Sequence, residues 1–158
     1  MVKRSRVRCH PPLRLRAGVV TLVALGVFAG TAPVSSSAAA TTITMQARAL
    51  SIAASKGGDP YRYGAAGPDS FDCSGLTYYA YRHAGASLPR TAQDQYRHSH
   101  HIPRSALHPG DLVFFHRGGL VYHVAIYAGD DAVWHAPHPG AAVRLEHIWT
   151  GDVWYGRP

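Results

Sequence analysis

The 158-residue sequence predicts an α+β domain in which N-terminal helices pack on an antiparallel β-sheet. Two observations support this prediction. Helix-like stretches with recognisable caps occupy the chain up to about residue 97, whereas short runs of β-branched and aromatic residues, separated by turns, follow from residue 112 on. Helices that precede a series of consecutive strands are typical of the α+β class, because parallel sheets alternate the two kinds of element.

The first 40 residues have the composition of a secretory signal peptide. Residues 1–16 are rich in Lys and Arg, residues 17–30 are apolar and uncharged, and Ala38 and Ala40 form a small-x-small site before Thr41. The apolar stretch is shorter than the ~20 residues of a membrane span, although an uncleaved anchor is the alternative. We therefore expect residues 1–40 to be removed, and residues 41–158 to form one exported domain with its core at about 45–155.

Loss of that segment changes the charge balance of the protein. Six of the 16 Lys and Arg residues and none of the nine acidic residues lie in it, so ten basic and nine acidic groups remain. The net charge of +7 is thus mostly a property of the first 40 residues. The remaining chain lacks the basic surplus that nucleic-acid binding requires, and we expect no nucleic-acid partner and no stable membrane association after cleavage.

Three helices are predicted before residue 97. The first runs over about 45–56, capped by residues 41–44, and Gly57 stops it. Asp72 is the predicted N-cap of the second helix, which ends near Gly85. A third, short helix begins after the cap Thr91 and continues through Tyr96.

A histidine-rich segment follows, with His98, His100 and His101 before Pro103. A metal site is one interpretation of this cluster, and a solvated connector is the other. No cysteine or carboxylate stands at ligand spacing nearby, which favours the connector. We expect neither a metal nor another cofactor.

Five short strands are predicted in the remaining chain, at residues 112–115, 121–128, 132–136, 143–145 and 153–155. Residues 129–131, Gly-Asp-Asp, form a hairpin turn between the second and third of these strands. The sheet is therefore expected to be antiparallel.

Cys73 is the candidate nucleophile. It would be the only cysteine left after removal of residues 1–40, because the other one is Cys9. An unpaired thiol in an oxidising compartment is usually buried or functional. With Asp72 as N-cap, Cys73 falls in the first helical turn, where free N–H groups and the positive end of the dipole favour a thiolate. We therefore expect the pKa of this thiol to be lowered and its sulfur to be reactive.

His123 and His135 are the candidate partners of the thiol. If residues 128–130 form a three-residue loop closed by Tyr127 and Asp131, the two histidines lie directly opposite each other on one face of the sheet. A two-residue loop would shift the register by one and place the rings on opposite faces. In the first register, one imidazole can accept the cysteine proton while the other fixes its orientation and tautomer.

Six short motifs occur in a defined order along the chain. They are residues 61–64 (Tyr-Arg-Tyr-Gly), 71–76 (Phe-Asp-Cys-Ser-Gly-Leu), 88–90 with Gln95, 109–115 (Pro-Gly-Asp-Leu-Val-Phe-Phe), 123–127 (His-Val-Ala-Ile-Tyr) and 135–136 (His-Ala). In this order and at this spacing they resemble the NlpC/P60 family of cell-wall cysteine peptidases, a papain-like group. The resemblance covers about residues 60–149.

The resemblance implies a papain-like fold and a Cys-His-His triad. Cys73 would be the nucleophile, His123 the general base and His135 the third polar residue that orients His123. The implied reaction is hydrolysis of peptidoglycan stem peptides, between D-glutamate (or D-isoglutamine) and the diamino acid at position three, through a thioester. The implied protein is a secreted or cell-wall enzyme, which we expect to be a monomer.

The resemblance also implies roles for residues near the nucleophile. Tyr61 would line the site and stabilise the oxyanion together with the backbone N–H of Cys73. Asp72 and Ser74 would shape the substrate pocket. Arg90 matches a family position as well, and we expect it to hold the fold.

Two alternatives stay open at this point. One is a different papain-like reaction, such as that of an amidase, an acyltransferase or a transglutaminase, which differs in the group that accepts the acyl chain. The other is a non-catalytic wall-binding module in which Cys73 is idle. The presence of all three triad residues argues against the second alternative.

Overall fold

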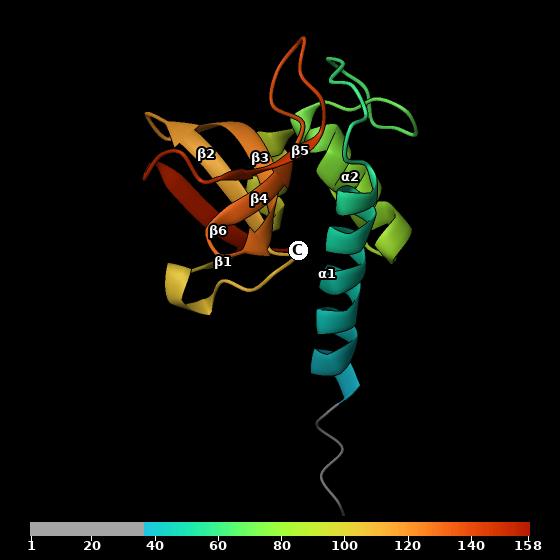
Figure 1. Ribbon diagram of the computed structural model, residues 1–158. Helices are drawn as coiled ribbons and strands as arrows, with labels where there is room; N and C mark the ends of the chain where they lie inside the picture. Colours follow the sequence, from blue (N-terminus) through green and yellow to red (C-terminus); the bar gives the residue numbers. More distant parts are fainter. Residues whose placement is uncertain (1–36) are drawn as a thin grey trace, which may run out of the picture. The chain divides into compact units, whose positions relative to one another are not determined.

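Along the described chain, three α-helices come first and the strands of the sheet follow. The computed structural model describes residues 37–158 (Figure 1). The helices are α1 (Ser37–Ser55), α2 (Cys73–Ala84) and α3 (Ala92–His98), with a 3-10 turn η1 at Arg104–Ala106. The strands are β1 (His100–Ile102), β2 (Leu112–Arg117), β3 (Leu120–Gly129), β4 (Ala132–His135), β5 (Arg144–His147) and β6 (Val153–Arg157).

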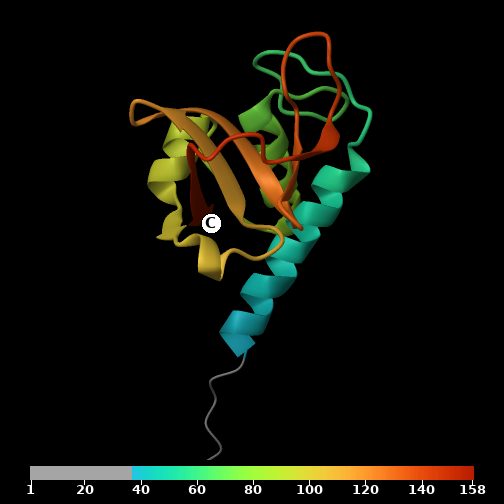
Figure 2. The same cartoon turned by 60° about the vertical axis from the view of Figure 1, so that its left-hand side comes forward.

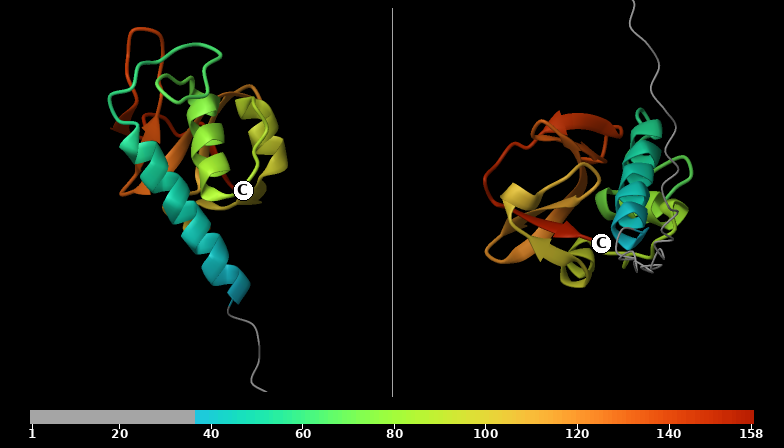
Figure 3. Two further views of the ribbon diagram at one scale, coloured as in Figure 1. Left: turned by 90° about the vertical axis from the view of Figure 1, so that its right-hand side faces the viewer. Right: turned by 90° about the horizontal axis from the view of Figure 1, so that it is seen from below.

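The strands of the described chain form one antiparallel sheet in the order β1-β6-β2-β3-β4-β5. Helices α1 and α2 lie next to each other on one side of this sheet, and α3 also contacts β3 (Figures 2 and 3). This arrangement confirms the α+β class that the order of elements predicted.

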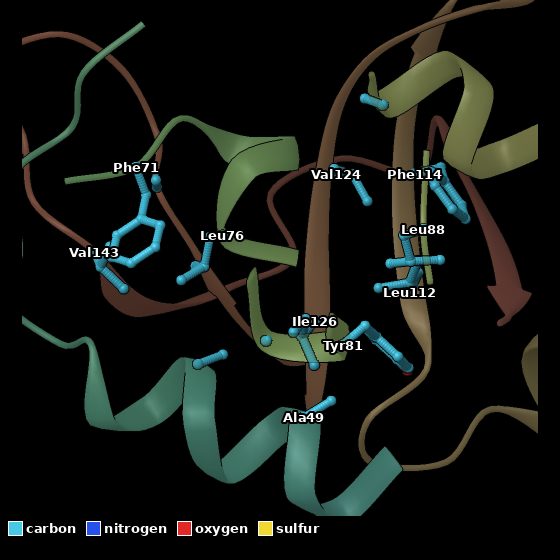
Figure 4. Packing of buried hydrophobic residues seen from close by; sticks show 14 of the residues in the cluster. Ala49, Phe71, Leu76, Tyr81, Leu88, Leu112, Phe114, Val124, Ile126 and Val143 are labelled. Carbon is cyan, nitrogen blue, oxygen red and sulfur yellow. The ribbon is translucent and has the colours of Figure 1, made fainter. Parts of the chain in front are cut away.

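The main hydrophobic core lies between the sheet and the helices. Alternate side chains of β2 and β3 point toward α1 and α2 and are fully buried there: Leu112, Phe114, Val124 and Ile126 (Figure 4). A smaller cluster on the other face contains Val113, Phe115, Ala125, Val133 and Tyr155. Because β2 is buried on both faces, its sequence is a continuous apolar run rather than an alternating pattern.

Helix α1 begins at Ser37 and not near Met45 as predicted. Residues 38–40 are alanines, the strongest helix formers, so the helical backbone extends through the expected cap region. The start of α1 projects beyond the rest of the domain (Figure 2). The predicted cleavage site falls within α1, while residues 1–36 lie outside the described residues, so the division at residue 40 stays a prediction. No helix in the range 37–158 is both long enough and apolar enough to cross a membrane.

The histidine-rich segment is solvent-exposed as predicted, but residues 100–102 form an edge strand rather than a loop. His98 ends α3, and residues 100–102 pair with residues 155–157 of β6 as β1. Sequence inspection missed this strand because its pairing partner lies more than fifty residues away. The ring of His101 stacks on Tyr96 with centroids 4.1 Å apart. Within residues 37–158, no three His, Cys, Asp or Glu side chains are grouped so that they could hold a metal ion.

The Pro109-Gly110-Asp111 turn before β2 is held by a buried ion pair. The Asp111 carboxylate is fully buried and accepts hydrogen bonds from Arg157 Nε (2.8 Å), Arg157 Nη2 (2.7 Å) and Gln46 Nε2 (2.8 Å). It thereby joins α1, the start of β2 and the last strand. Gly110 has φ near +99°, and a Cβ there would lie 2.6 Å from the Gln46 carbonyl oxygen, so the turn requires glycine.

We expect Asp111→Ala to lower the free energy of unfolding by about 3 kcal/mol, because it leaves Arg157 and Gln46 without their buried acceptor. The Arg157 side chain is 29% exposed and water can solvate part of it, which places the effect at the lower end of the range for a broken buried pair. Urea unfolding measures the change. Asp130→Asn, in the exposed β3–β4 turn, is the matched control and should cost less than about 0.5 kcal/mol. Equal effects of the two substitutions would contradict the role of Asp111.

Candidate active site

Cys73 is the first residue of α2, as the predicted N-cap required. Asp72 has an extended backbone, and its side chain accepts a hydrogen bond from the backbone N–H of Gly75 at 2.6 Å. Gly85, in the left-handed conformation, ends the helix. The local sequence therefore places the thiol in the first turn of a helix that packs on β3.

The Asp72 carboxylate is the centre of a hydrogen-bond network around that turn. Arg90 binds it in a bidentate manner, with Nη1–Oδ1 and Nη2–Oδ2 distances of 2.9 and 2.6 Å, and also donates to Ser74 Oγ at 3.0 Å. The backbone N–H of Gly64 donates to Asp72 Oδ2 at 2.8 Å. Arg90 thus holds the fold, as expected, because it fixes the cap that orients α2. The Arg90 guanidinium keeps the pKa of Asp72 below its usual value despite the burial of the carboxyl group.

The second motif also needs a glycine two residues after the nucleophile. A Cβ on Gly75 would collide with the carbonyl oxygen of Ala65, in the loop that precedes α2. The backbone N–H of Asp72 donates to the same carbonyl at 2.9 Å. The close approach of the loop to the first turn of α2 therefore explains the small residue at position 75.

The predicted register of the histidine hairpin is wrong, although its consequence holds. Asp130 and Asp131 both have positive φ and form a two-residue turn in which Gly129 pairs with Ala132. Alone, that turn would send the two histidine rings to opposite faces. A β-bulge between Tyr127 and Gly129 shifts the register by one more residue, so Tyr127 pairs with Val133. The bulge returns both rings to one face, and they meet diagonally rather than directly opposite each other.

His123 and His135 form part of a hydrogen-bonded chain that continues to a carboxylate. His123 Nε2 lies 3.0 Å from His135 Nδ1, and His135 Nε2 lies 3.0 Å from Glu146 Oε2. Arg144 Nε donates to the same Glu146 oxygen at 2.8 Å. The two imidazoles are 6% and 2% exposed, whereas the Glu146 side chain is 39% exposed, so the chain runs from the interior to the surface.

Trp149, in the segment between β5 and β6, packs beside the hydrogen-bonded His123 and His135. Its ring stacks on Phe115 with centroids 4.0 Å apart and lies 5.7 Å from His123 and 5.2 Å from His135. The indole therefore limits the access of water to the imidazole pair and restricts the orientation of both rings.

Two clefts meet at the thiol. The histidine cleft, about 440 Å³, is lined by Cys73, Tyr61, Tyr122, His123, His135, Pro137, His138, Arg144, Glu146 and Trp149. The arginine cleft, about 450 Å³, is lined by Cys73, Tyr61, Tyr122, Tyr63, Gly64, Asp72, Ser74, Arg90, Thr91, Ala92, Gln93 and Val121. Cys73, Tyr61 and Tyr122 belong to both, so a ligand that extends through both clefts passes the sulfur.

The pKa of the Cys73 thiol is raised, not lowered as the helix position predicted. Burial is the largest cause, and the negative charge of Asp72 adds to it, outweighing hydrogen bonds from Val124 and Ser74 that favour the thiolate. The N-cap explains the difference from the prediction. The Asp72 carboxylate already occupies the positive end of the helix dipole and presents its own negative charge to the sulfur.

Burial also keeps His123 and Tyr61 neutral. It lowers the pKa of His123 to about 3, with the neighbouring His135 as a smaller cause in the same direction. It raises the pKa of Tyr61, and the nearby Cys73 contributes to that increase. At neutral pH the site therefore holds a thiol, an imidazole with a free lone pair and a phenol that can donate a hydrogen bond.

The structure brings all six predicted site residues to the junction of the two clefts. Cys73, His123, His135 and Tyr61 line the histidine cleft, while Asp72 and Ser74 line the arginine cleft. Sequence reasoning missed the other six residues of the histidine cleft, namely Tyr122, Pro137, His138, Arg144, Glu146 and Trp149. A partial signal was present for Arg144 and Glu146. The predicted strand ended at residue 145, but β5 continues to His147, and charged residues two positions apart on one strand point to the same face.

A helix-borne thiol and a strand-borne imidazole pair that line one cleft define the papain-like class of sites. The NlpC/P60 family matches residues 58–155, more than half of the chain. The chain belongs to the NlpC/P60 family, as its motifs predicted.

Named relatives extend this finding. A protein of Corynebacterium glutamicum (strain R), named "Probable endopeptidase", is 42% identical over 105 residues, which cover 66% of this chain and 49% of that protein. Murein DD-endopeptidase MepH of Escherichia coli (strain K12) is 40% identical over 103 residues, covering 61% and 38%. The solved structure of the peptidoglycan hydrolase RipB from Mycobacterium tuberculosis superposes with a TM-score of 0.68 and 27% identity, covering 75% and 66%. The chain spans less than half the length of these two curated relatives.

The raised pKa of Cys73 predicts how fast the thiol reacts at each pH. In a Cys9→Ser chain, which leaves Cys73 as the single thiol, the rate of iodoacetamide alkylation should keep rising with pH beyond pH 9, because the thiolate forms only above the normal thiol pKa. The urea-unfolded chain, in which the thiol is solvated, is the control and should level off at lower pH. A plateau below pH 7 in the folded protein would show a resting thiolate and contradict the burial argument.

Proposed function

We propose that this chain is a secreted cysteine endopeptidase that hydrolyses peptidoglycan stem peptides through Cys73, His123 and His135. The observation that carries the proposal is the cleft in which the thiol and the hydrogen-bonded imidazole pair meet. Two relatives whose names refer to peptidoglycan or murein support the substrate class.

The first half of the reaction forms a thioester. The Cys73 thiol gives its proton to His123 as the sulfur attacks the scissile carbonyl carbon, because neither group is charged at rest. The oxyanion that forms accepts hydrogen bonds from the backbone N–H of Cys73 and the Tyr61 hydroxyl, which its raised pKa keeps protonated. The carbon–nitrogen bond then breaks, and the leaving amine takes the proton from His123.

The second half returns the enzyme to its resting state. Water attacks the thioester carbonyl while His123 accepts its proton, and the sulfur leaves as a thiolate that recovers that proton. The products are the free thiol and a carboxylic acid, which releases its proton to water and leaves as a carboxylate.

The two clefts suggest a direction for the bound peptide. The leaving amine must reach His123, so the part of the substrate that follows the scissile bond occupies the histidine cleft. The acyl part then occupies the arginine cleft, beside Asp72, Ser74 and Arg90. This assignment agrees with the pocket-shaping roles expected for Asp72 and Ser74.

Within this class we propose the bond between D-glutamate (or D-isoglutamine) and the diamino acid as the one that is cut. The family resemblance of the motifs around Tyr61 and Cys73 supports it. A second candidate is the cross-link between two D-amino acids, because the name of the Escherichia coli relative describes a DD-endopeptidase. We further propose that residues 1–40 direct export, that the mature protein acts in the cell wall as a monomer, and that no cofactor takes part.

Digestion of defined muropeptides, read by mass spectrometry, tests the reaction and the bond together. We expect stem peptides to be cut between residues two and three, and Cys73→Ala to abolish cleavage because no nucleophile remains. Cleavage only of cross-linked muropeptides would select the second bond. Cleavage by Cys73→Ala at the wild-type rate would exclude the cysteine mechanism. If a folded protein with a reactive Cys73 cuts no muropeptide, a different acyl substrate becomes the leading candidate.

A further inference from the structure

The geometry points to Glu146 as a positioning residue that fixes the tautomers of both active-site histidines. The inference rests on the proposed function for the roles of Cys73 and His123, and it adds a fourth member to the triad. Its basis is the unbroken chain of contacts from Glu146 through His135 to His123, with two successive distances of 3.0 Å.

Glu146 is the fixed end of this chain because it can only accept hydrogen bonds. The Arg144 guanidinium, 2.8 Å from Glu146 Oε2, keeps the carboxyl ionised by holding its pKa below the usual value. An ionised carboxylate has no proton to donate. His135 Nε2 must therefore carry the hydrogen in the contact with Glu146.

The tautomer of His135 then determines that of His123. Burial keeps His135 neutral, so its hydrogen on Nε2 leaves a lone pair on Nδ1. His123 Nε2, which lies 3.0 Å from that lone pair, must be the donor. Because His123 is also neutral, its Nδ1 is the basic atom that can accept the proton of Cys73. The Glu146 carboxylate thus determines, through the intervening His135, which nitrogen of His123 carries the lone pair.

The same charge also supports the reacting state. When His123 accepts the thiol proton, a positive charge forms in a buried site with little water to solvate it. His135 accepts a hydrogen bond from the imidazolium and is itself bound to Glu146, so the negative charge lies in line with the new positive charge. The other charged or titratable groups at this end of the cleft, Arg144 and His138, oppose a positive charge on His135 and leave Glu146 as its source of stabilisation.

The sheet presents Glu146 at a partly exposed position next to His135. Glu146 on β5 pairs with Val133 on β4, so the two side chains lie on the same face of the sheet. His135 is two residues after Val133 on β4 and therefore lies on that face as well. The side chain is 39% exposed, and β5 is an edge strand of the sheet. A substitution at this position removes polar contacts to His135 and Arg144 without opening a cavity in the core.

The test compares Glu146→Ala, Glu146→Gln and Glu146→Asp in the full chain. We expect Glu146→Ala to lower kcat on muropeptides by about 10- to 100-fold with little change in KM, the range typical of lost outer partners of a functional histidine. Gln retains an acceptor but no charge and should give an intermediate loss, while Asp should recover part of the activity. Asp130→Asn removes an exposed carboxylate in the turn of the β3–β4 hairpin, which carries both histidines at its other end. It is the control and should leave kcat unchanged.

A second readout needs no peptidoglycan. Nitrogen-15 NMR of histidine-labelled protein distinguishes the two neutral tautomers, and we expect both His123 and His135 to carry the hydrogen on Nε2 in the wild type. In Glu146→Ala, His135 should populate the Nδ1–H form. Alkylation of Cys73 at pH 8 should slow in Glu146→Ala and not in Asp130→Asn.

These measurements separate the inference from the proposed function. Predicted tautomers together with absence of muropeptide cleavage would contradict only the proposed function. An Nδ1–H tautomer of His123 in the wild type, or unchanged tautomers and kcat in Glu146→Ala, would overturn the role of Glu146. Because the wild-type spectrum alone tests the tautomers, the inference remains testable even if a variant fails to fold.

Discussion

The Asp72 carboxylate is the constraint on which the rest of the site depends. It caps α2 by accepting a hydrogen bond from the backbone N–H of Gly75, and it accepts another from the backbone N–H of Gly64 in the preceding loop. Both terminal nitrogens of Arg90 also donate to it. Because Cys73 follows Asp72 directly in the chain, this network positions the sulfur at the start of α2. The carboxylate also has an electrostatic cost, since its charge disfavours a thiolate beside it.

That cost bears on the mechanism proposed for the histidine side of the site. In this mechanism the thiolate of Cys73 is disfavoured at rest, so a base has to take the thiol proton during the attack. Burial makes His123 neutral and therefore able to accept it, but burial also disfavours the imidazolium that results. The line of contacts through His135 to the exposed Glu146 offsets this effect with a charge that remains partly solvated.

The two halves of the site are joined by the main hydrophobic core. Leu76 of α2 packs in one buried cluster with Val124 and Ile126 of β3, so the helix that carries the thiol is fixed against the strand that carries His123 (Figure 4). The two clefts meet at Cys73, the first residue of that helix. A change in core volume between α2 and β3 would therefore alter the separation of the thiol and the imidazole, and affect chemistry as well as stability.

Features that depend on near neighbours in the chain could be predicted from the sequence: the caps of α2 and α3, the strands from β2 to β6, the six motifs and six of the residues that line the two clefts. The other features depend on the tertiary structure. The pairing of β1 with β6, the contact between Glu146 and His135, and the raised pKa of Cys73 all depend on groups distant in the chain or on burial. The hairpin shows the reason most clearly. A single bulge near residue 128 decides on which face the histidines lie, and the packing of both sheet faces, rather than the turn residues alone, selects that bulge.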